Sequence, residues 1–275
     1  MAQTKSEIQA LLSASNSNGP RHRFGQNFMI DQNLVRLVAD SAGITKDDTV
    51  IEVGPGTGTL TEELLERAGR LIAVEIDRDL SKLLRDRFGS NERFELIEGD
   101  ALAGKHQLNS QIIAKIARRS KLVANLPYNI ASPLVIELLI GGLDLLVFTV
   151  QREVADRLRA TENDDSYGPL SVMAALLAKV EVLRTLSPQA FWPAPKVESA
   201  LVRMTRVDRL GDAAPDFSRF VHQLFSFRRK TLRKALTQAG YDPLVLGHAQ
   251  LNPQARPENI SPEKLLELFT LLTRA

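Results

Sequence analysis

The stretch VIEVGPGTGTLTEEL, residues 50–64, decides the fold of this chain. A short apolar run ends at Val53, glycines follow at positions 54, 56 and 58, and apolar residues take helical spacing from Leu60 onward. Glycine lets a ligand approach the backbone closely, and the N-terminus of a helix offers free amides to an anionic group. The stretch therefore predicts a ligand-binding turn between a strand and a helix; the alternative is a glycine-rich turn that binds nothing.

The spacing of the three glycines favours one class of binding turn over another. A dinucleotide-binding turn has the pattern G-x-G-x-x-G, whereas the third glycine here comes one position early and Thr59 follows it. The spacing G-x-G-x-G is more typical of folds that bind S-adenosylmethionine.

The chain around this stretch has the pattern of an α/β fold. From Thr49 to about Gln151, short apolar runs alternate with amphipathic segments such as residues 60–68 and 80–88. This alternation predicts a doubly wound, open parallel sheet covered by helices. The candidate strands are residues 50–53, 71–75, 94–97, 122–125 and 145–151.

The second half of the chain adds an edge hairpin and a helical domain. Residues 180–186 and 200–206 are predicted to pair as antiparallel strands at the sheet edge. The stretch RLGDAAP, residues 209–215, holds turn formers and marks a domain boundary. We therefore predict a flexible tail over residues 1–20, a sheet domain over 21–208 and a helical domain over 209–275.

Composition excludes several kinds of chemistry. The 275 residues include no cysteine, which rules out disulfides, thiolate zinc sites and a cysteine nucleophile such as cytosine C5 methylation requires. No apolar run is long enough for a signal peptide or a membrane span, and the four histidines have no metal-ligand spacing. We expect a soluble, cytoplasmic protein without a metal.

Acidic residues follow two of the predicted strands. Glu75 ends the second strand, where a carboxylate can accept hydrogen bonds from both hydroxyls of a ribose. Asp100 follows the third strand and is placed to accept from the exocyclic amine of an adenine. Acidic residues at strand ends are usually solvated, but the upstream glycine turn favours a role for both as ligand contacts.

The sharpest signal is Asn125-Leu126-Pro127-Tyr128 at the end of the fourth strand. An aromatic amine is a poor nucleophile, because its lone pair is delocalised into the ring. The Asn125 side-chain oxygen and the carbonyl of Leu126 or Pro127 would hold its two N–H bonds and favour a pyramidal nitrogen, while Tyr128 would stack on a flipped base. Catalysis would rest on orientation and hydrogen bonding, with no metal or covalent intermediate. The alternative is a proline turn that merely closes a strand.

At these residues the chain resembles the KsgA-like small-subunit ribosomal RNA adenine N6,N6-dimethyltransferases, over about residues 21–233. The resemblance implies a Rossmann-like class I S-adenosylmethionine methyltransferase sheet with a small all-α C-terminal domain. It also implies dimethylation of two adjacent adenosines near the 3′ end of 16S rRNA in the 30S subunit, and we expect a monomer. Seven ordered blocks carry it: RFGQNFMID (23–31), the glycine turn, AVEID (73–77), GDAL (99–102), NLPYNIASPL (125–134), FWPAPKVES (191–199) and FSFRRKTLRKAL (225–236).

The resemblance assigns roles by position. Phe191 would sandwich the target adenine opposite Tyr128, unless it is simply a core residue, and Met29 stands where family members usually have leucine. The resemblance places the cofactor against Asn27, Met29, Gly54, Gly56, Glu75, Asp100, Ala101 and Asn125.

Five cations within seven residues resemble the family's basic C-terminal helix and are predicted to bind RNA phosphates; a merely solvated helix face is the alternative. Two rival functions stay open: a large-subunit rRNA methyltransferase of the antibiotic-resistance type, and a non-enzymatic nucleic-acid-binding factor on the same fold. The five cations are Arg228, Arg229, Lys230, Arg233 and Lys234.

Overall fold

The structure is a computed structural model of the chain that describes residues 3–15, 19–104, 107–117 and 119–274. It contains two compact units. The sheet unit comprises Met1–Ala155 and Glu181–Arg206, and the helical unit comprises Asp156–Val180 and Val207–Ala275. The chain thus enters the helical unit twice. The predicted boundary at residues 209–215 lies near the second entry, whereas the first entry was not predicted.

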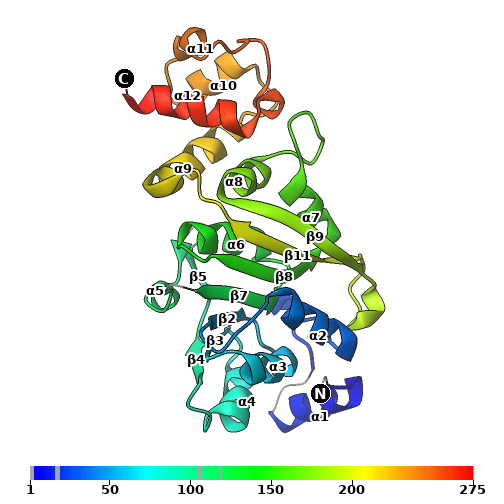
Figure 1. Cartoon of the computed structure of the whole chain (residues 1–275). Helices are drawn as coiled ribbons and strands as arrows, with labels where there is room; N and C mark the ends of the chain where they lie inside the picture. Colours follow the sequence, from blue (N-terminus) through cyan, green and yellow to red (C-terminus); the bar gives the residue numbers. More distant parts are fainter. Residues whose placement is uncertain (1–2, 16–18, 105–106, 118, 275) are drawn as a thin grey trace. The chain divides into compact units, whose positions relative to one another are not determined.

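The sheet unit is built on a seven-stranded sheet with the order β4-β3-β2-β7-β8-β11-β9 (Figure 1). Strands β2, β3, β4, β7 and β8 are parallel, and β11 pairs antiparallel with β8. The predicted strands are therefore confirmed, including the edge pair. Their bounds are β2 (Thr49–Val53), β3 (Arg70–Glu75), β4 (Phe94–Glu98), β7 (Ser120–Asn125), β8 (Leu145–Gln151), β9 (Ala178–Leu186) and β11 (Ser199–Arg206).

Helices connect the parallel strands and bury one face of the sheet in a shared core. Alternate strand residues such as Val50, Leu71, Val123 and Val147 point to the same face, because successive side chains of a strand alternate. They pack there against α2 (Gln32–Ser41), α3 (Thr59–Arg67) and α4 (Arg78–Phe88). The remaining connections carry α5 (Ser110–Ile113) and the apolar α6 (Ala131–Ile140).

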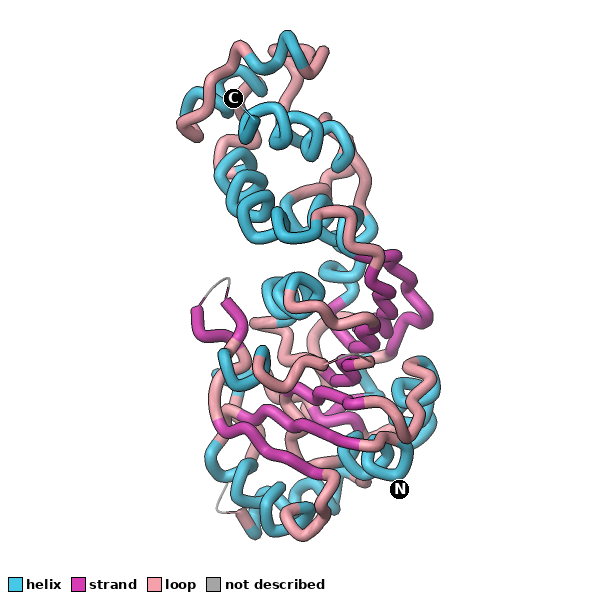
Figure 2. Tube along the Cα trace, turned by 60° about the vertical axis from the view of Figure 1, so that its left-hand side comes forward, coloured by secondary structure: helices cyan, strands magenta, loops and turns pink. Residues whose placement is uncertain are grey.

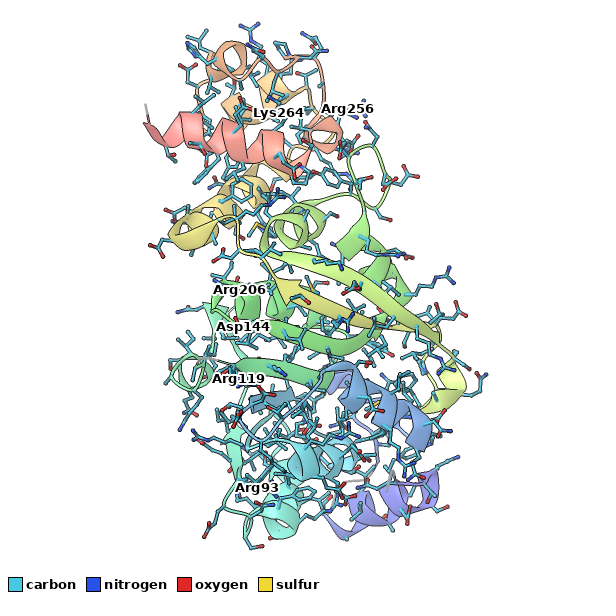
Figure 3. The ribbon with its side chains drawn as sticks, in the orientation of Figure 1. Arg93, Arg119, Asp144, Arg206, Arg256 and Lys264 are labelled. Atoms are coloured by element: carbon cyan, nitrogen blue, oxygen red, sulfur yellow. The ribbon has the colours of Figure 1, made fainter. Side chains whose placement is uncertain are left out.

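The carboxyl ends of the parallel strands differ from the opposite end of the sheet. The strand order reverses between β2 and β7, so their carboxyl ends flank a topological switch point, where α/β folds place ligands. At the opposite end, the Arg206 amide donates to the Asp144 carbonyl at 2.9 Å, and Figure 3 labels both residues there. A site is therefore expected at Val53, Glu75 and Asn125, the last residues of three parallel strands.

Short strands and turns complete the sheet unit. Strand β1 (Phe28–Met29) pairs antiparallel with β10 (Phe191–Trp192), which ties the N-terminal segment to the FWPAPKVES block. The other short elements are β5 (Leu102–Gly104), β6 (Gln107–Leu108), η1 (His22–Phe24) and η2 (Pro188–Ala190). Figure 2 distinguishes helices, strands and loops along the chain.

The prediction of a flexible tail over residues 1–20 is wrong for the part that the structure describes. Helix α1 (Lys5–Ala14) begins with a capping box between Thr4 and Glu7 and buries Ile8 and Leu12. The sequence does carry this signal, because T-x-x-E followed by apolar residues four positions apart is a helix start. Residues 1–2 and 16–18 lie outside the described residues.

The helical unit has its own aromatic core. The rings of Phe217 and Phe220 lie 5.4 and 5.5 Å from that of Phe269, and the Tyr167 hydroxyl donates to the Ile260 carbonyl at 2.8 Å. Helix α7 (Arg152–Arg159) leads into this unit from the sheet. Its other elements are α8 (Pro169–Leu177), α9 (Ala214–Phe225), α10 (Leu232–Gln238), α11 (Val245–His248), α12 (Pro262–Arg274), η3 (Gly211–Ala213) and η4 (Pro257–Asn259).

No helix within the described residues is long and apolar enough to cross a membrane.

Candidate active site

A cavity of about 230 Å³ opens at the carboxyl ends of the parallel strands of the sheet unit. Five separate stretches of sequence line it, so the fold brings together residues up to about a hundred positions apart. The five stretches are residues 23–29, 52–60 apart from Gly58, 74–80 through residues 74–76 and Leu80, 99–101 and 125–130. All predicted cofactor-binding residues and the four residues of the NLPY turn (residues 125–128) are among them; their individual roles stay predictions.

The glycine turn is packed closely against neighbouring rings. Gly54, Gly56 and Gly58 all have positive φ angles, a conformation that glycine adopts without strain. A Cβ at Gly56 would lie 2.9 Å from a ring carbon of Phe28, and one at Gly54 would lie 3.1 Å from Pro127. The turn is therefore in contact with both the N-terminal segment and the NLPY turn.

Glu75 is the buried acceptor of the cavity. One oxygen of its carboxylate accepts from the Gly56 amide at 3.2 Å, and the other accepts from the Asp77 amide at 2.9 Å. Burial raises the pKa of Glu75 to about 7, against the lowering effect of these hydrogen bonds. A ligand that donates hydrogen bonds to this carboxylate would therefore bind best to its ionised form.

Glu52 is a second buried acid that the sequence analysis missed. Its side chain lines the cavity, and its carboxylate accepts from the Thr61 hydroxyl at 2.7 Å. Burial, together with the nearby charge of Glu75, raises its pKa to about 8 against the lowering effect of the Thr61 hydrogen bond. The signal was present, because a carboxylate inside the apolar run 50–53 is costly to bury and so indicates a special environment.

Asp100 differs from the two buried acids. It is exposed at the mouth of the cavity, and its carboxylate accepts from the Leu102 amide at 3.0 Å, which fixes the loop after β4. Ala101 beside it is buried. This loop thus offers an exposed acceptor next to a small apolar surface, which suits the edge and face of an aromatic base.

Asn125 is held at both ends of its amide. Its nitrogen donates to the Asn27 carbonyl at 2.6 Å, and its oxygen accepts from the hydroxyl of Thr149. A carbonyl can only accept, so the contact with Asn27 fixes which end of the amide is nitrogen. Thr149 was missed in the sequence, because a single threonine in an apolar strand looks like an ordinary β-branched residue.

The rest of the NLPY turn combines a buried residue with an aromatic wall. Leu126 is buried, whereas Pro127 and Tyr128 are half-buried. The hydroxyls of Tyr128 and Ser199 share a hydrogen bond of 2.7 Å, and burial raises the pKa of Tyr128. Tyr128 therefore presents its ring to the cavity from a tethered position.

The N-terminal segment forms another wall. Asn27 donates from its side chain to the Gly25 carbonyl at 3.1 Å, and Met29 is buried beside it in β1. Arg21 pairs with Asp77 at 2.6 Å and also with Asp79, both of which follow Glu75 in the chain. These ion pairs hold the segment against the loop that carries the buried acceptor.

The expectation that Phe191 sandwiches a base opposite Tyr128 does not fit this structure. Phe191 is 2% exposed, belongs to the core beneath the sheet and is not among the residues that line the cavity. Its pairing with Met29 in the β1–β10 ladder turns its side chain toward that core, whereas Trp192 packs beside Phe28. The alternative interpretation, a core residue, describes its position here.

The five cations of the predicted RNA-binding helix, here called the basic cluster, are all exposed. They do not lie on one helix: residues 226–230 form the turn after α9, and only Arg233 and Lys234 lie in α10. After α9 the Phe227 and Arg228 amides donate to carbonyls three residues back, and the Leu232 and Arg233 amides that begin α10 donate to the Ala255 and Pro253 carbonyls. Among the described residues, the cluster's one ion pair joins Arg228 to Glu258 at 3.8 Å.

The cavity provides hydrogen-bond acceptors and apolar walls. Glu75 and Asp100 suit the hydroxyl and amine donors of a nucleoside, and the glycine turn admits a ligand close to the backbone. Asn125 and Tyr128 suit an amine-bearing aromatic base. The arrangement is equipped to orient two ligands against each other.

Comparison with known proteins gives consistent matches. The chain matches the family model described as "Ribosomal RNA adenine dimethylase" over residues 17–274. It is 42% identical to the "Ribosomal RNA small subunit methyltransferase A" of Hahella chejuensis over 245 residues, which cover 87% of this chain and 88% of that protein.

Two solved structures have a similar fold. A dimethyladenosine transferase from Plasmodium falciparum has a TM-score of 0.71 at 24% identity, covering 90% of this chain and 97% of its own. The 23S rRNA methyltransferase ErmE has a TM-score of 0.61 at 27% identity, covering 90% of this chain and 100% of its own.

Proposed function

Because the chain belongs to the ribosomal RNA adenine dimethylase family, we propose that its sheet unit transfers methyl groups from S-adenosyl-L-methionine to N6 of adenosine in ribosomal RNA. The observation that carries this proposal is that Glu75 and Asn125, fifty positions apart, line one cavity with the glycine turn. A cofactor site and a base site are thereby joined.

The residues of the cavity fit S-adenosylmethionine. The buried Glu75 carboxylate would accept from the ribose hydroxyls, and Asp100 would accept from the adenine amine beside Ala101. Gly54 and Gly56 leave room at the backbone, and Asn27 and Met29 would close the cofactor in from the N-terminal segment. When bound, the cofactor supplies an electrophilic methyl group on a sulfonium.

The NLPY turn would orient the adenosine amine. The Asn125 side-chain oxygen accepts one bond from Thr149, and its second lone pair would accept from the substrate amine. The Pro127 carbonyl already accepts from the Ile130 amide at 3.2 Å, so we assign the second acceptor to the Leu126 carbonyl. Two acceptors would favour a pyramidal nitrogen whose lone pair faces the methyl group, with the base stacked on Tyr128.

This mechanism relies on positioning rather than on acid–base chemistry. Holding two reactants in a productive orientation alone can contribute roughly 7–11 kcal/mol toward lowering a barrier. We propose no proton transfer by Glu52 or Glu75, because their place in the cavity suits cofactor binding.

We propose that the substrate is the 30S subunit and that two adjacent adenosines near the 3′ end of 16S rRNA are each dimethylated. The basic cluster of the helical unit would bind RNA phosphates, which would make binding dependent on salt. We further propose that the enzyme acts in the cytoplasm as a monomer, since one chain carries both the cavity and the basic cluster.

The rival substrate is large-subunit rRNA, the type that ErmE's name records. The higher identity to small-subunit enzymes, 42% against 27%, favours the 30S particle. Methylation of purified 30S and 50S particles in parallel, followed by mass spectrometry of the rRNA, tests this. We expect N6,N6-dimethyladenosine in 16S rRNA; labelling confined to 50S particles would overturn the choice.

A further inference from the structure

We infer that Ser199 is a positioning residue, whose hydroxyl holds the Tyr128 ring in the orientation that receives the target base. This inference rests on the proposed function, because it assigns a means of base recognition to the same cavity. It adds a residue of β11, the strand between β8 and β9, and the cavity lining does not include this residue.

The hydrogen bond links the Tyr128 ring, which must be oriented toward the base, to Ser199, whose position is fixed. Tyr128 is half-buried, lies outside regular secondary structure and lines the cavity. Its hydroxyl lies 2.7 Å from the Ser199 hydroxyl, within the range of a good O–H···O hydrogen bond. The hydroxyl oxygen lies on the axis of the ring's second torsion, so the hydrogen bond restricts chiefly the first torsion, which sets where the ring lies.

Ser199 itself is firmly placed. It is 0% exposed and pairs with Gln151 at the start of the β8–β11 ladder. On its N-terminal side, the Glu198 carbonyl accepts from the Arg152 amide at 3.0 Å. The serine hydroxyl therefore occupies a position set by backbone hydrogen bonds rather than by Tyr128.

The hydrogen bond is also needed for chemical reasons. A tyrosine hydroxyl removed from water requires a partner, and a partner buried on a strand holds the hydroxyl to one place. With Phe191 turned into the core, Tyr128 is the aromatic residue of the NLPY turn that can face the base. Loss of the tether would leave the ring free to move about its first torsion.

Ser199→Ala and Tyr128→Phe remove the same hydrogen bond from its two ends and keep the ring. We expect each to lower kcat/KM for 30S particles about tenfold, as for one lost hydrogen bond, chiefly through KM for the RNA. The dissociation constant for S-adenosylmethionine should stay unchanged, because neither hydroxyl contacts the predicted cofactor residues. The double variant should be no worse than either single one.

Ser120→Ala is the matched control. Ser120 is an equally buried strand serine, at the opposite end of β7, and its hydroxyl accepts from the Ala117 amide at 2.9 Å. Its loss should reduce stability without changing KM for 30S particles. If Ser199→Ala proves poorly folded by circular dichroism, Tyr128→Phe carries the test alone.

The possible outcomes separate the inference from the function beneath it. Wild-type activity in Tyr128→Phe, equal KM changes in the Ser120 control, or additive losses in the double variant would each overturn the inference alone. A wild-type protein that methylates neither ribosomal particle would instead overturn the proposed function and remove the basis of the inference.

Discussion

The hydroxyl of Thr149 on β8 donates a hydrogen bond to the side-chain oxygen of Asn125, its register partner on β7. The amide nitrogen of Asn125 is bound separately by the Asn27 carbonyl at 2.6 Å. These two contacts fix the direction of the amide, so its oxygen lies on the side where an acceptor is required. The backbone register of the sheet therefore helps to determine where the amide oxygen and nitrogen of Asn125, the predicted catalytic group, lie.

Asn125→Ala should abolish methyl transfer while leaving the fold intact, because it removes one of the two acceptors for the substrate amine. We expect the loss to appear in kcat, with near-normal circular dichroism and cofactor affinity reduced less than activity. Substantial residual methylation by a folded variant would contradict the mechanism.

Thr149→Val keeps the shape of the side chain but removes the donor to Asn125. Since Asn27 still holds the amide nitrogen, we expect a partial loss, about three- to tenfold in kcat. Thr149→Ser retains the hydroxyl and serves as the control that should recover most of the activity. Equal activities for the valine and serine variants would show that the hydroxyl is not needed.

Cofactor affinity should depend on pH through Glu75. Its pKa of about 7 in the unliganded protein means that, below pH 7, the carboxylate must lose a proton before it can accept from a ribose. Affinity for S-adenosylmethionine should therefore fall as pH drops below 7, approaching tenfold per pH unit. Glu75→Gln should bind more weakly and remove most of this dependence.

Isothermal titration calorimetry between pH 5.5 and 8.5 measures the affinity of the wild type and of Glu75→Gln for S-adenosylmethionine. The comparison matters because Glu52 titrates in the same cavity, so a slope that persists unchanged in Glu75→Gln would belong to Glu52 instead.

Glu52→Gln should stabilise the protein at high pH. The folded-state pKa of about 8 lies above the ordinary value of 4.5 for a glutamate, so the folded state holds a proton that the unfolded state releases. The contribution of Glu52 is thus favourable below pH 4.5 and is lost as pH rises through 8. At pH 8.5 we expect the glutamine variant to gain roughly 2–5 kcal/mol over wild type, and little at pH 5.

Urea unfolding at the two pH values measures this difference. The control is Glu66→Gln, which removes an exposed carboxylate from α3, the helix that follows β2. It should leave the pH dependence of stability unchanged. An equal gain at both pH values would argue against a titrating Glu52.

Replacing Arg228, Arg229 and Lys230 by glutamine should weaken RNA binding and reduce its salt dependence, because each lost phosphate contact lowers the slope of log K against log salt by about one. Cofactor affinity, set in the sheet unit, should not change.

The matched control carries the same charge change in the same unit. It replaces Arg219, Arg256 and Lys264, which pair with Asp216, Glu258 and Glu267; Figure 3 labels the second and third of these cations. Equal loss of RNA binding in both triple variants would indicate a general charge effect rather than a binding surface.

Patterns along the chain were enough to predict the sheet, since apolar runs such as 50–53 and 122–125 are buried strands whose ends carry Asn125 and its neighbours. Partners across strands were not predictable. Thr149 and Ser199 gain their roles from register, and register depends on pairings that a single sequence does not display.

The errors have the same origin. Phe191 was assigned to the base from the family resemblance, but alternation in a two-residue strand turns it the other way. Helix α1 was overlooked because ten residues make a marginal helix in isolation; besides its capping box, the packing of Ile8 and Leu12 against Phe28 and Leu80 stabilises it.

The contact between Gln3 and Thr57 has a practical side. The Gln3 side chain donates to the Thr57 carbonyl and accepts from its hydroxyl, which fastens the beginning of the chain to the wall of the cofactor cavity. Peptide fused directly before Gln3 would emerge beside that wall. Affinity handles and fluorescent fusions for this enzyme therefore belong after α12, and trimming the first fifteen residues to aid crystallisation would remove part of what supports the glycine turn.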